Sequence, residues 1–310
     1  MKLAFYNDFL LGVVKGNNIV DVTSVARDVP HTTPGNLINT LIERFDDFRK
    51  RLEDAAAGSS GVPVSSVRIR PPLPKPGNIA CMAVNYMENG TLAKPAPLNA
   101  FHKASTSIIG PDDTMVLPDV PATIFEGEAE LAVVIGKRTA NVSAAKAMDH
   151  VFGYVNFIDG SARGLPPAGN TFFQMKSRDT FAPIGPYLVT KDEIADPQEV
   201  PIKLWVNGEL KQDFNTNDMA HKIPRCIEWI SSIHTLEPGD IVATGTNHRG
   251  LSAFMDGDVV ELECTGLGHL KFNIRDTLQR KWLRETRLDR QRKGQEGPTP
   301  QVSGKHAANG

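Results

Sequence analysis

The stretch Thr123–Lys137, TIFEGEAELAVVIGK, places acidic residues within a segment that otherwise reads as a buried strand. Three glutamates, Glu126, Glu128 and Glu130, alternate with small or apolar residues and run directly into the apolar segment 131–135. Side chains of a strand alternate between its two faces, so Glu128 and Glu130 point to the same side, and Glu126 can join them. Carboxylates that converge on a buried face cost several kcal/mol unless a cation neutralises them. The pattern therefore predicts a metal site, with a solvated, charged strand edge as the alternative.

Composition limits the classes of protein to which the chain can belong. Its 310 residues are 40% hydrophobic, which is enough for a substantial core. A net charge of -2, with acids and bases interspersed, offers no field for nucleic acid or an anionic membrane. No apolar run approaches the roughly 20 residues of a membrane span, and no export signal is evident. Three widely spaced cysteines indicate neither a disulfide framework nor a thiolate metal site, so we expect a cytoplasmic protein.

The first 70 residues read as a small N-terminal unit. Short β-rich runs at 2–6, 10–14 and 18–22 predict strands, with a turn at 15–18 between the last two. Apolar residues then recur every three or four positions over 36–57, which predicts a helix with one buried face.

Strand-like runs dominate residues 71–277, the predicted main domain. They are the segments 131–136, 153–159, 185–190, 202–208, 240–245 and 258–264. Only two helices are expected, at 143–151 with Ser143 as N-cap, and at 223–233. This balance predicts an α+β, mostly β fold rather than a doubly wound parallel sheet. The basic tail 278–310 is expected to form a frayed helix followed by disorder.

Asp159 gives the acidic strand a partner. It ends the run GYVNFID and is followed by Ser161, Ala162 and Arg163. An isolated aspartate at a strand end is usually a turn or cap residue. An E-x-E pair about 30 residues before D-x-S-A-R is more specific, and here the sequence resembles the fumarylacetoacetate hydrolase family. Seven segments match in family order across about 72–274: VNYMENG, EAELAVVIGK, GYVNFIDGSAR, KSRDTFAPIGPYLVT, WVNGELKQ, LEPGDIVATGT and GDVVELECTGLG.

The resemblance implies a β-rich catalytic domain that acts on small oxo or dioxo acids. It further implies a divalent metal held by Glu128, Glu130 and Asp159, and assembly as a homodimer or a higher homo-oligomer. Three oxygen ligands without His or Cys favour Mg²⁺, with Mn²⁺ or Ca²⁺ possible. Such an ion acts as a Lewis acid that stabilises an enolate by several kcal/mol.

Further site residues follow from the same matches. Lys176 corresponds to the family's active-site lysine, whereas without the match it reads as a surface lysine. Arg163 can bind a substrate carboxylate through its guanidinium, with a structural salt bridge as the alternative. Five residues are expected to line the substrate, with a plain turn or core packing as their alternative roles: Asn85, Tyr86, Thr244, Gly245 and Thr246.

One departure affects the expected reaction. Hydrolytic members of the family typically read Asn-Tyr-x-x-His-x-x-Glu, where the His and Glu activate water. Here Asn89 and Leu92 occupy those two positions, and a neutral amide cannot take a proton. We hypothesise that His248 supplies a base from another side, with Glu88 as a second candidate; the alternatives are a solvated loop histidine and a surface acid.

The main functional prediction is a metal-dependent hydrolase that cleaves a carbon–carbon bond in an acylpyruvate or diketo acid, in catabolism of an aromatic or sugar acid. The alternative is a 2-oxo acid decarboxylase or keto-enol isomerase, which the missing His–Glu pair favours because an enolate needs no attacking water. A second alternative is an inert, ligand-binding relative, since a fold alone does not guarantee chemistry.

Overall fold

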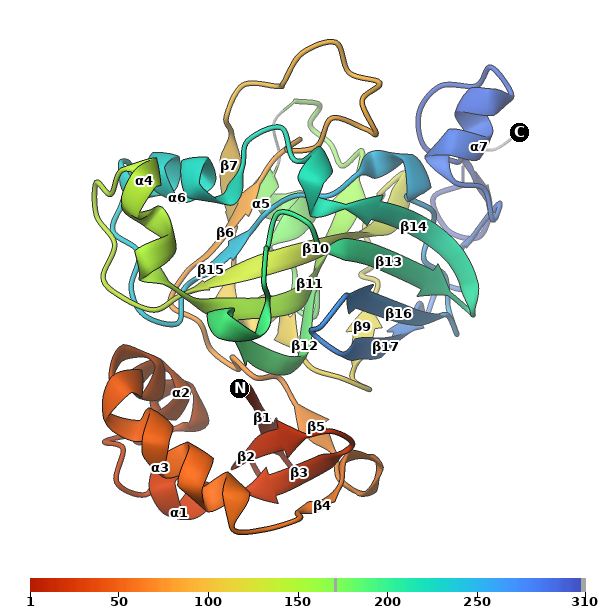
Figure 1. The fold of residues 1–310 in the computed structure, drawn as a ribbon. Coiled ribbons are helices and arrows are strands. Elements are labelled where there is room, and N and C mark those ends of the chain that lie inside the picture. The colour runs from red at the N-terminus through yellow and green to blue at the C-terminus, as the bar shows by residue number, and fades with distance from the viewer. Residues whose placement is uncertain (170–171, 308–310) are drawn as a thin grey trace.

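The computed structural model of the chain describes residues 1–169 and 172–307, and Figure 1 shows their arrangement. Within these ranges the fold is α+β and mostly β, as predicted. The largest sheet has the order β4 (Val62–Pro63), β3 (Asn18–Asp21), β2 (Leu10–Lys15), β1 (Lys2–Tyr6), β12 (Ala182–Thr190), β11 (Val151–Arg163), β10 (Ile124–Ile135), β15 (Ile241–Ala243), β6 (Ile79–Met82) and β7 (Ala100–Lys103). Two short strands pair with it, β5 (Ile69–Arg70) on β1 and β8 (Ile108–Ile109) on β12.

A second, five-stranded sheet completes the main body. Its order is β14 (Glu209–Asn215), β13 (Pro201–Val206), β16 (Val259–Cys264), β17 (His269–Arg275) and β9 (Thr114–Val116). All six strand runs predicted in the main domain lie on strands of these two sheets. β14 and β17 follow their predecessors through short turns and were not predicted. Charged residues interrupt the apolar alternation of β14, whereas β17 alternates regularly, with Leu270, Phe272 and Ile274 buried, and this signal was missed.

The N-terminal residues form a meander with helices beside it, at the bottom of Figure 1. The turn between β2 and β3 lies where the sequence predicted it, with Lys15 opposite Asn18. The prediction of a single helix at 36–57 was wrong, because two separate helices, α2 (Pro34–Glu43) and α3 (Phe45–Ala57), occupy this region. Arg44 breaks the helix with backbone angles of φ −110° and ψ 27°, while the apolar periodicity continues on both sides of it. The short α1 (Thr23–Ala26) precedes them.

Strand pairing crosses the boundary predicted at residue 70. β1 pairs antiparallel with β12, and Leu3 lies opposite Leu188. Leu3 and Leu188 also belong to one hydrophobic cluster with Leu41 of α2 and Val134 of β10. The N-terminal unit therefore packs directly onto the main sheet, and the division at residue 70 stays a prediction.

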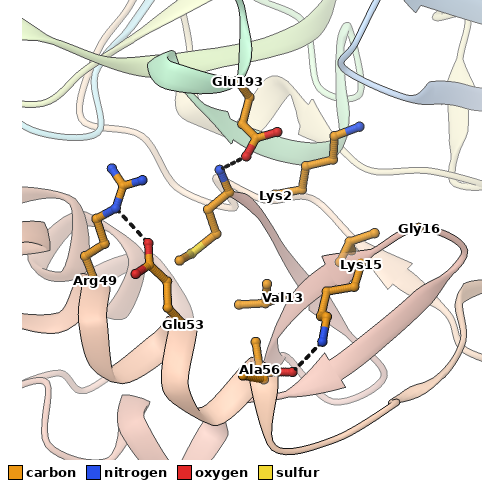
Figure 2. Close-up of a pocket in the computed structure, with 11 residues that line it drawn as sticks. Lys2, Val13, Lys15, Gly16, Arg49, Glu53, Ala56 and Glu193 are labelled. Atoms are coloured by element: carbon orange, nitrogen blue, oxygen red, sulfur yellow. Dashed lines mark hydrogen bonds and ion pairs between the residues drawn. The ribbon is translucent and has the colours of Figure 1, made fainter.

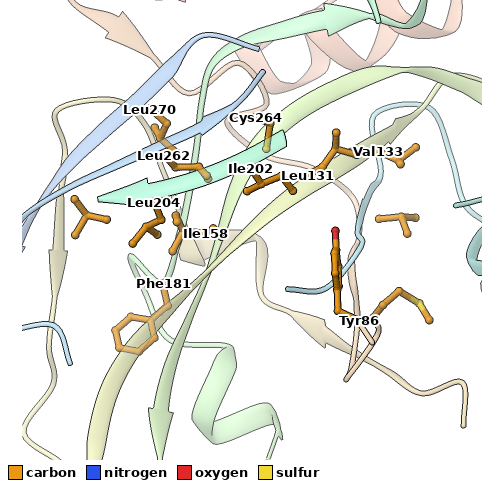
Figure 3. Packing of buried hydrophobic residues seen from close by; sticks show 14 of the residues in the cluster. Tyr86, Leu131, Val133, Ile158, Phe181, Ile202, Leu204, Leu262, Cys264 and Leu270 are labelled. Atoms are coloured by element: carbon orange, nitrogen blue, oxygen red, sulfur yellow. The ribbon is translucent and has the colours of Figure 1, made fainter. Parts of the chain in front are cut away.

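The central strand β10 is buried along all twelve residues. Leu131 and Val133 face the cluster between the two sheets, which Figure 3 shows with Leu204 and Leu262 of the second sheet. Ala132 and Val134 face the other cluster, beneath the N-terminal helices. A strand with both faces covered needs no polar alternation, which explains the continuous apolar run at its end.

Helices cover the edges of the main body. α4 (Ala144–Ala147) packs against α6 (Ile223–Ser231), near the two predicted positions. Ser143 is at the N-cap position of α4, but its hydroxyl makes no capping bond; the Glu228 carboxylate accepts from Ala144 N at 3.0 Å instead. α5 (Phe172–Lys176) contacts β11 and β7. No helix among the described residues has the length and apolarity that crossing a bilayer would need.

The tail contains more regular structure than the sequence indicated. α7 (Arg287–Arg292) begins with a capping box made by Thr286 and Asp289. β18 (Lys281–Trp282) and β19 (Gln301–Ser303) pair around it, although β19 lies in the part expected to be disordered. Trp282 Nε1 donates to the carbonyl of Thr123 at 2.8 Å, which joins the tail to the start of β10.

Replacing Leu131 with alanine tests the importance of the packing between the sheets. Leu131 is fully buried, so Leu131→Ala should lower the free energy of unfolding by about 2–5 kcal/mol. Leu210→Ala is the matched control, because Leu210 is 45% exposed and should change stability by about 0.5 kcal/mol or less. Urea denaturation measures both, and equal effects would contradict this account of the core.

Candidate metal centre and active site

Three acidic side chains from two neighbouring strands meet at the centre of the large sheet. Glu128 and Asp159 are directly opposite in the antiparallel pairing of β10 with β11, and Glu130 is two residues further along β10. One carboxylate oxygen of each lies within 4.8 Å of those of the other two, and all three residues are buried. The structure thus brings together the three residues predicted to bind a metal.

Two lysines neutralise part of this charge. Lys176, at the end of α5, donates from Nζ to Glu128 Oε1 at 2.8 Å and to Asp159 Oδ2 at 2.6 Å. Lys176 is 2% exposed, so the surface-lysine alternative is wrong. Lys103, at the end of β7, donates to Asp159 Oδ1 at 2.7 Å and to the carbonyl of Lys176. Lys103 could not be identified from the sequence, because its strand has only four residues and no motif surrounds it.

Glu126 does not join the metal cluster, contrary to the possibility drawn from alternation. Arg163 donates from Nε to Glu126 Oε2 at 2.6 Å, and Arg287 of α7 donates to the same oxygen at 2.6 Å. Two arginines thus occupy this carboxylate, and Arg163 also contacts Glu128. The salt-bridge alternative describes the contacts of Arg163 here, while its binding of a substrate carboxylate stays a prediction.

Glu130 is the acid that the protein leaves incompletely bonded. Its Oε2 accepts from Gly245 N at 2.6 Å, but within residues 1–169 and 172–307 its buried Oε1 has no hydrogen-bond partner. Burial, together with the charges of Asp159 and Glu128, raises the pKa of Glu130 well above its ordinary value. For Glu128 burial acts in the same direction, but the Lys176 and Arg163 charges outweigh it and hold its pKa below the usual range. A divalent cation fits this donor set, because it would bond Glu130 Oε1 and neutralise the negative charge of the carboxylates.

The loop after β15 fixes the position of Glu130. Thr244 Oγ1 donates to the Leu131 carbonyl, and Thr246 Oγ1 donates to the Ala129 carbonyl, both at 2.7 Å. Gly245 has φ +90°, a conformation that glycine adopts without strain, and a Cβ there would lie 3.0 Å from Asn85 Cβ. The threonine hydroxyls therefore fasten the loop to β10 and aim the Gly245 N–H at Glu130.

Other predicted substrate-lining residues support the same loop. Asn85 donates to the Thr244 carbonyl at 2.9 Å and accepts from His221 N. Tyr86 is buried and packs edge-on against Phe214, with ring centroids 5.1 Å apart, as its core-packing alternative predicted. These contacts identify positioning roles, and contact with substrate stays a prediction for all five residues.

Gln212 is a further buried residue that the sequence did not single out. Its amide oxygen accepts from Ala129 N at 3.1 Å, and its amide nitrogen donates to Thr246 Oγ1 at 2.9 Å. It therefore links β14 to both the acidic strand and the loop. The sign of it in the sequence is that Gln212 ends WVNGELKQ, one of the segments that match the family.

The two candidates for proton transfer lie in contact. His248 Nδ1 is 2.7 Å from Glu88 Oε1, although 160 residues separate them in the chain. Asn89 and Leu92, which replace the family's His and Glu, are both exposed. The structure therefore pairs His248 with Glu88, which the sequence indicated only as an alternative candidate for the base.

Two cavities differ in their relation to the acids. Figure 2 shows one of about 520 Å³ at the N-terminus, where the Met1 amino group binds Glu193 at 2.5 Å and Lys15 binds the Ala56 carbonyl. None of the clustered acids lines it. Another cavity, of about 640 Å³, is bounded by Arg163 and by residues 298–301 of the tail. The second one reaches the arginine that contacts Glu128, so the tail forms part of the surroundings of the site.

The fold and the carboxylate cluster define a β-rich protein with a buried site for a hard divalent cation. The family model described as Fumarylacetoacetate (FAA) hydrolase C-terminal matches residues 78–275. The chain belongs to the fumarylacetoacetate hydrolase family.

Relatives align over nearly their whole length. A maleylpyruvate hydrolase of Aquipseudomonas alcaligenes is 33% identical, covering 89% of this chain and 99% of the relative. Oxaloacetate tautomerase YisK of Bacillus subtilis is 36% identical, covering 88% of this chain and 100% of the relative. The crystal structure of maleylpyruvate hydrolase from Sphingobium sp. SYK-6, in complex with manganese(II) ion and pyruvate, aligns with a TM-score of 0.80 at 35% identity, covering 89% of this chain and 99% of that one.

The raised pKa of Glu130 predicts that metal binding releases a proton. Metal ligation requires the carboxylate, so the proton that burial favours must leave, and about one proton per ion should be released. The affinity for Mn²⁺ should rise with pH up to the pKa of Glu130 in the metal-free protein and level off above it. Calorimetry in buffers of different ionisation enthalpy measures the release.

Glu130→Gln is the control for this titration, since it removes the ionising group; it should bind Mn²⁺ weakly and without that proton release. An affinity of the unaltered protein that does not change with pH would contradict the prediction.

Proposed function

We propose that the protein is a divalent-metal-dependent enzyme that acts on a small oxo or dioxo acid through an enolate. The observation that carries the proposal is the buried group of Glu128, Glu130 and Asp159, in which one oxygen of Glu130 lacks a partner. The manganese and pyruvate named for the Sphingobium relative support both the metal and the substrate class. Mg²⁺ stays our first choice from the all-oxygen donor set, with Mn²⁺ as the alternative.

A bound divalent cation supplies Lewis-acid stabilisation of negative charge on substrate oxygens, a contribution of several kcal/mol. The chain supplies the rest of the environment. Lys176 donates to Glu128 and Asp159, and Lys103 donates to Asp159, so the two lysines offset part of the negative charge of the cluster. Lys176 Nζ lies beside two of the proposed ligands, where it can hydrogen-bond a substrate oxygen or return a proton to carbon. Burial excludes water from these contacts, which strengthens each of them.

Carbon–carbon bond hydrolysis of an acylpyruvate is the first candidate reaction, because the maleylpyruvate hydrolases align over almost the whole chain. Keto-enol tautomerisation, with decarboxylation as a related outcome, is the second. It is favoured by the exposed Asn89 and Leu92, which leave no acid–base pair where hydrolytic members carry one. The similarity to oxaloacetate tautomerase supports this second candidate independently.

Assays with and without metal distinguish the candidates. Purified protein should turn over an acylpyruvate or oxaloacetate only with Mg²⁺ or Mn²⁺, and the identity of the product shows which reaction occurs. Asp159→Asn should lower kcat/KM at least about 100-fold, because several kcal/mol of charge stabilisation depends on the cation. Glu43→Gln, on the exposed end of α2, is the control and should remain active. Full activity of Asp159→Asn would contradict a metal-dependent reaction.

Lys176→Met separates catalysis from metal binding. Because Lys176 donates to two of the proposed ligands, its removal frees Glu128 and Asp159 and should leave Mn²⁺ affinity unchanged or stronger. Turnover should nevertheless fall by about 10²-fold or more, as expected when a proton donor is lost.

Lys50→Met is the control for this variant, since Lys50 is 83% exposed on α3. Calorimetry and steady-state kinetics measure the two effects. A variant of Lys176 that binds no Mn²⁺ would indicate that the lysine only holds the site together.

A further inference from the structure

Glu88 and His248 form a closely bonded pair made by two separate loops. The ring Nδ1 of His248 lies 2.7 Å from Glu88 Oε1, and the backbone N of His248 donates to both carboxylate oxygens at 3.0 and 3.1 Å. The side chains are 22% and 13% exposed for His248 and Glu88, respectively. A solvated loop histidine would not make three such contacts with one acid.

This contact determines which ring nitrogen is free. An ionised carboxylate only accepts hydrogen bonds, so in the neutral ring Nδ1 carries the proton and Nε2 has an available lone pair. Among the described residues, Nε2 of His248 has no hydrogen-bond partner, and the partial exposure of the ring leaves it accessible. A histidine oriented by a carboxylate at one nitrogen and open at the other is suited to accept a proton.

The loop that carries Glu88 is held in one conformation. Met87 N donates to the Asp218 carbonyl at 2.9 Å, and Asn89 N donates to its carboxylate at 2.8 Å. Glu88 and Asn89 have φ values of +54° and +56°, which cost non-glycine residues of order 1–3 kcal/mol each. Arg249 donates to the Glu88 carbonyl. Strained backbone retained by several bonds indicates that the position of Glu88 matters.

The pair belongs to the same corner of the protein as the acid cluster. His248 follows the 244–246 loop by two residues, and Gly245 of that loop binds Glu130. Asn247, the residue before His248, accepts at its carbonyl from the Gln212 amide at 2.7 Å, and the same Gln212 side chain bonds Ala129 N between Glu128 and Glu130. The charged groups around the ring are Glu88 in contact, Arg249 and Asp218 on the adjoining loops, and Glu128 beyond.

We propose that Glu88 and His248 are the proton-transfer pair of this site, in which His248 Nε2 removes a proton from C3 of an enolisable 2-oxo acid. The C3–H bond breaks and its electrons form the C2=C3 double bond, while the carbonyl electrons move to oxygen. That oxygen then takes a proton from solvent, and His248 returns its own proton to solvent. Glu88 is a positioning residue that sets the tautomer. This assignment rests on the proposed function.

Exchange of the methyl protons of pyruvate in D₂O, followed by ¹H NMR with Mg²⁺ present, tests the pair directly. His248→Gln should lower the exchange rate by about 10²-fold or more, because the proton acceptor is removed. Glu88→Gln should lower it by at least about 10-fold, because the ring loses the carboxylate that sets its tautomer and orientation. Imidazole added to His248→Ala should restore part of the rate.

The matched control is His269→Gln. His269 is 50% exposed and lies near Glu261 and Glu263, so like His248 it is a histidine beside acids. It has no part in the proposed site, and its replacement should leave the exchange rate unchanged. Mn²⁺ affinity measured by calorimetry should be unchanged in all four variants. In the metal-free protein, Glu88→Gln should also shift the Nδ1–H resonance of His248 upfield, since the carboxylate no longer accepts that proton.

Wild-type exchange in His248→Gln, or loss of its Mn²⁺ affinity, would overturn the assignment of the pair and leave the proposed function intact. If the proposed function itself is wrong, the unaltered protein will show neither metal-dependent proton exchange nor turnover of oxo acids. That result would overturn both proposals.

Discussion

The structure depends on gathering carboxylates in the interior of a sheet from which water is excluded. Removing an ion from water costs several kcal/mol after relaxation, so each buried acid needs a partner. The protein provides equal numbers of the two charges: Glu126, Glu128, Glu130 and Asp159 face Lys103, Lys176, Arg163 and Arg287. Of these four acids, Glu130 alone has a buried oxygen without a hydrogen-bond partner in the described part of the chain, and a cation would bond that oxygen.

The fold can be understood as the means of bringing these partners to one place. β10 and β11 carry the acids in fixed register, whereas the cations come from β7, from the end of α5, from the tail helix α7 and, for Arg163, from the end of β11 itself. The 244–246 loop adds a backbone N–H, and the hydroxyls beside it bond to β10 rather than pointing outward. Residues expected to touch substrate thus hold the residues that would bind the cation. Precise placement of a few oxygen ligands requires this kind of support.

The contribution of the tail extends the site beyond the segment that matches the family. Residues 78–275 contain the acids and both lysines, but Arg287 comes from α7. Arg287 shares Glu126 with Arg163, and Arg163 also contacts Glu128, so three successive ion pairs connect the tail to the cluster. Residues 298–301 line the cavity beside Arg163.

The sequence alone determined the mostly β class, the acidic strand and its partner Asp159, because period-two alternation and ordered motif spacing are local properties. It could not show that Arg44 divides a helix, since the apolar spacing is the same on both sides of the break. Nor could it find Lys103 or the contact between Glu88 and His248. Those depend on which strands and loops lie side by side, and pairing between segments up to 160 residues apart is decided by the whole core. Local pattern and the family resemblance therefore indicated the proposed metal ligands, whereas the tertiary structure shows the groups that orient and neutralise them.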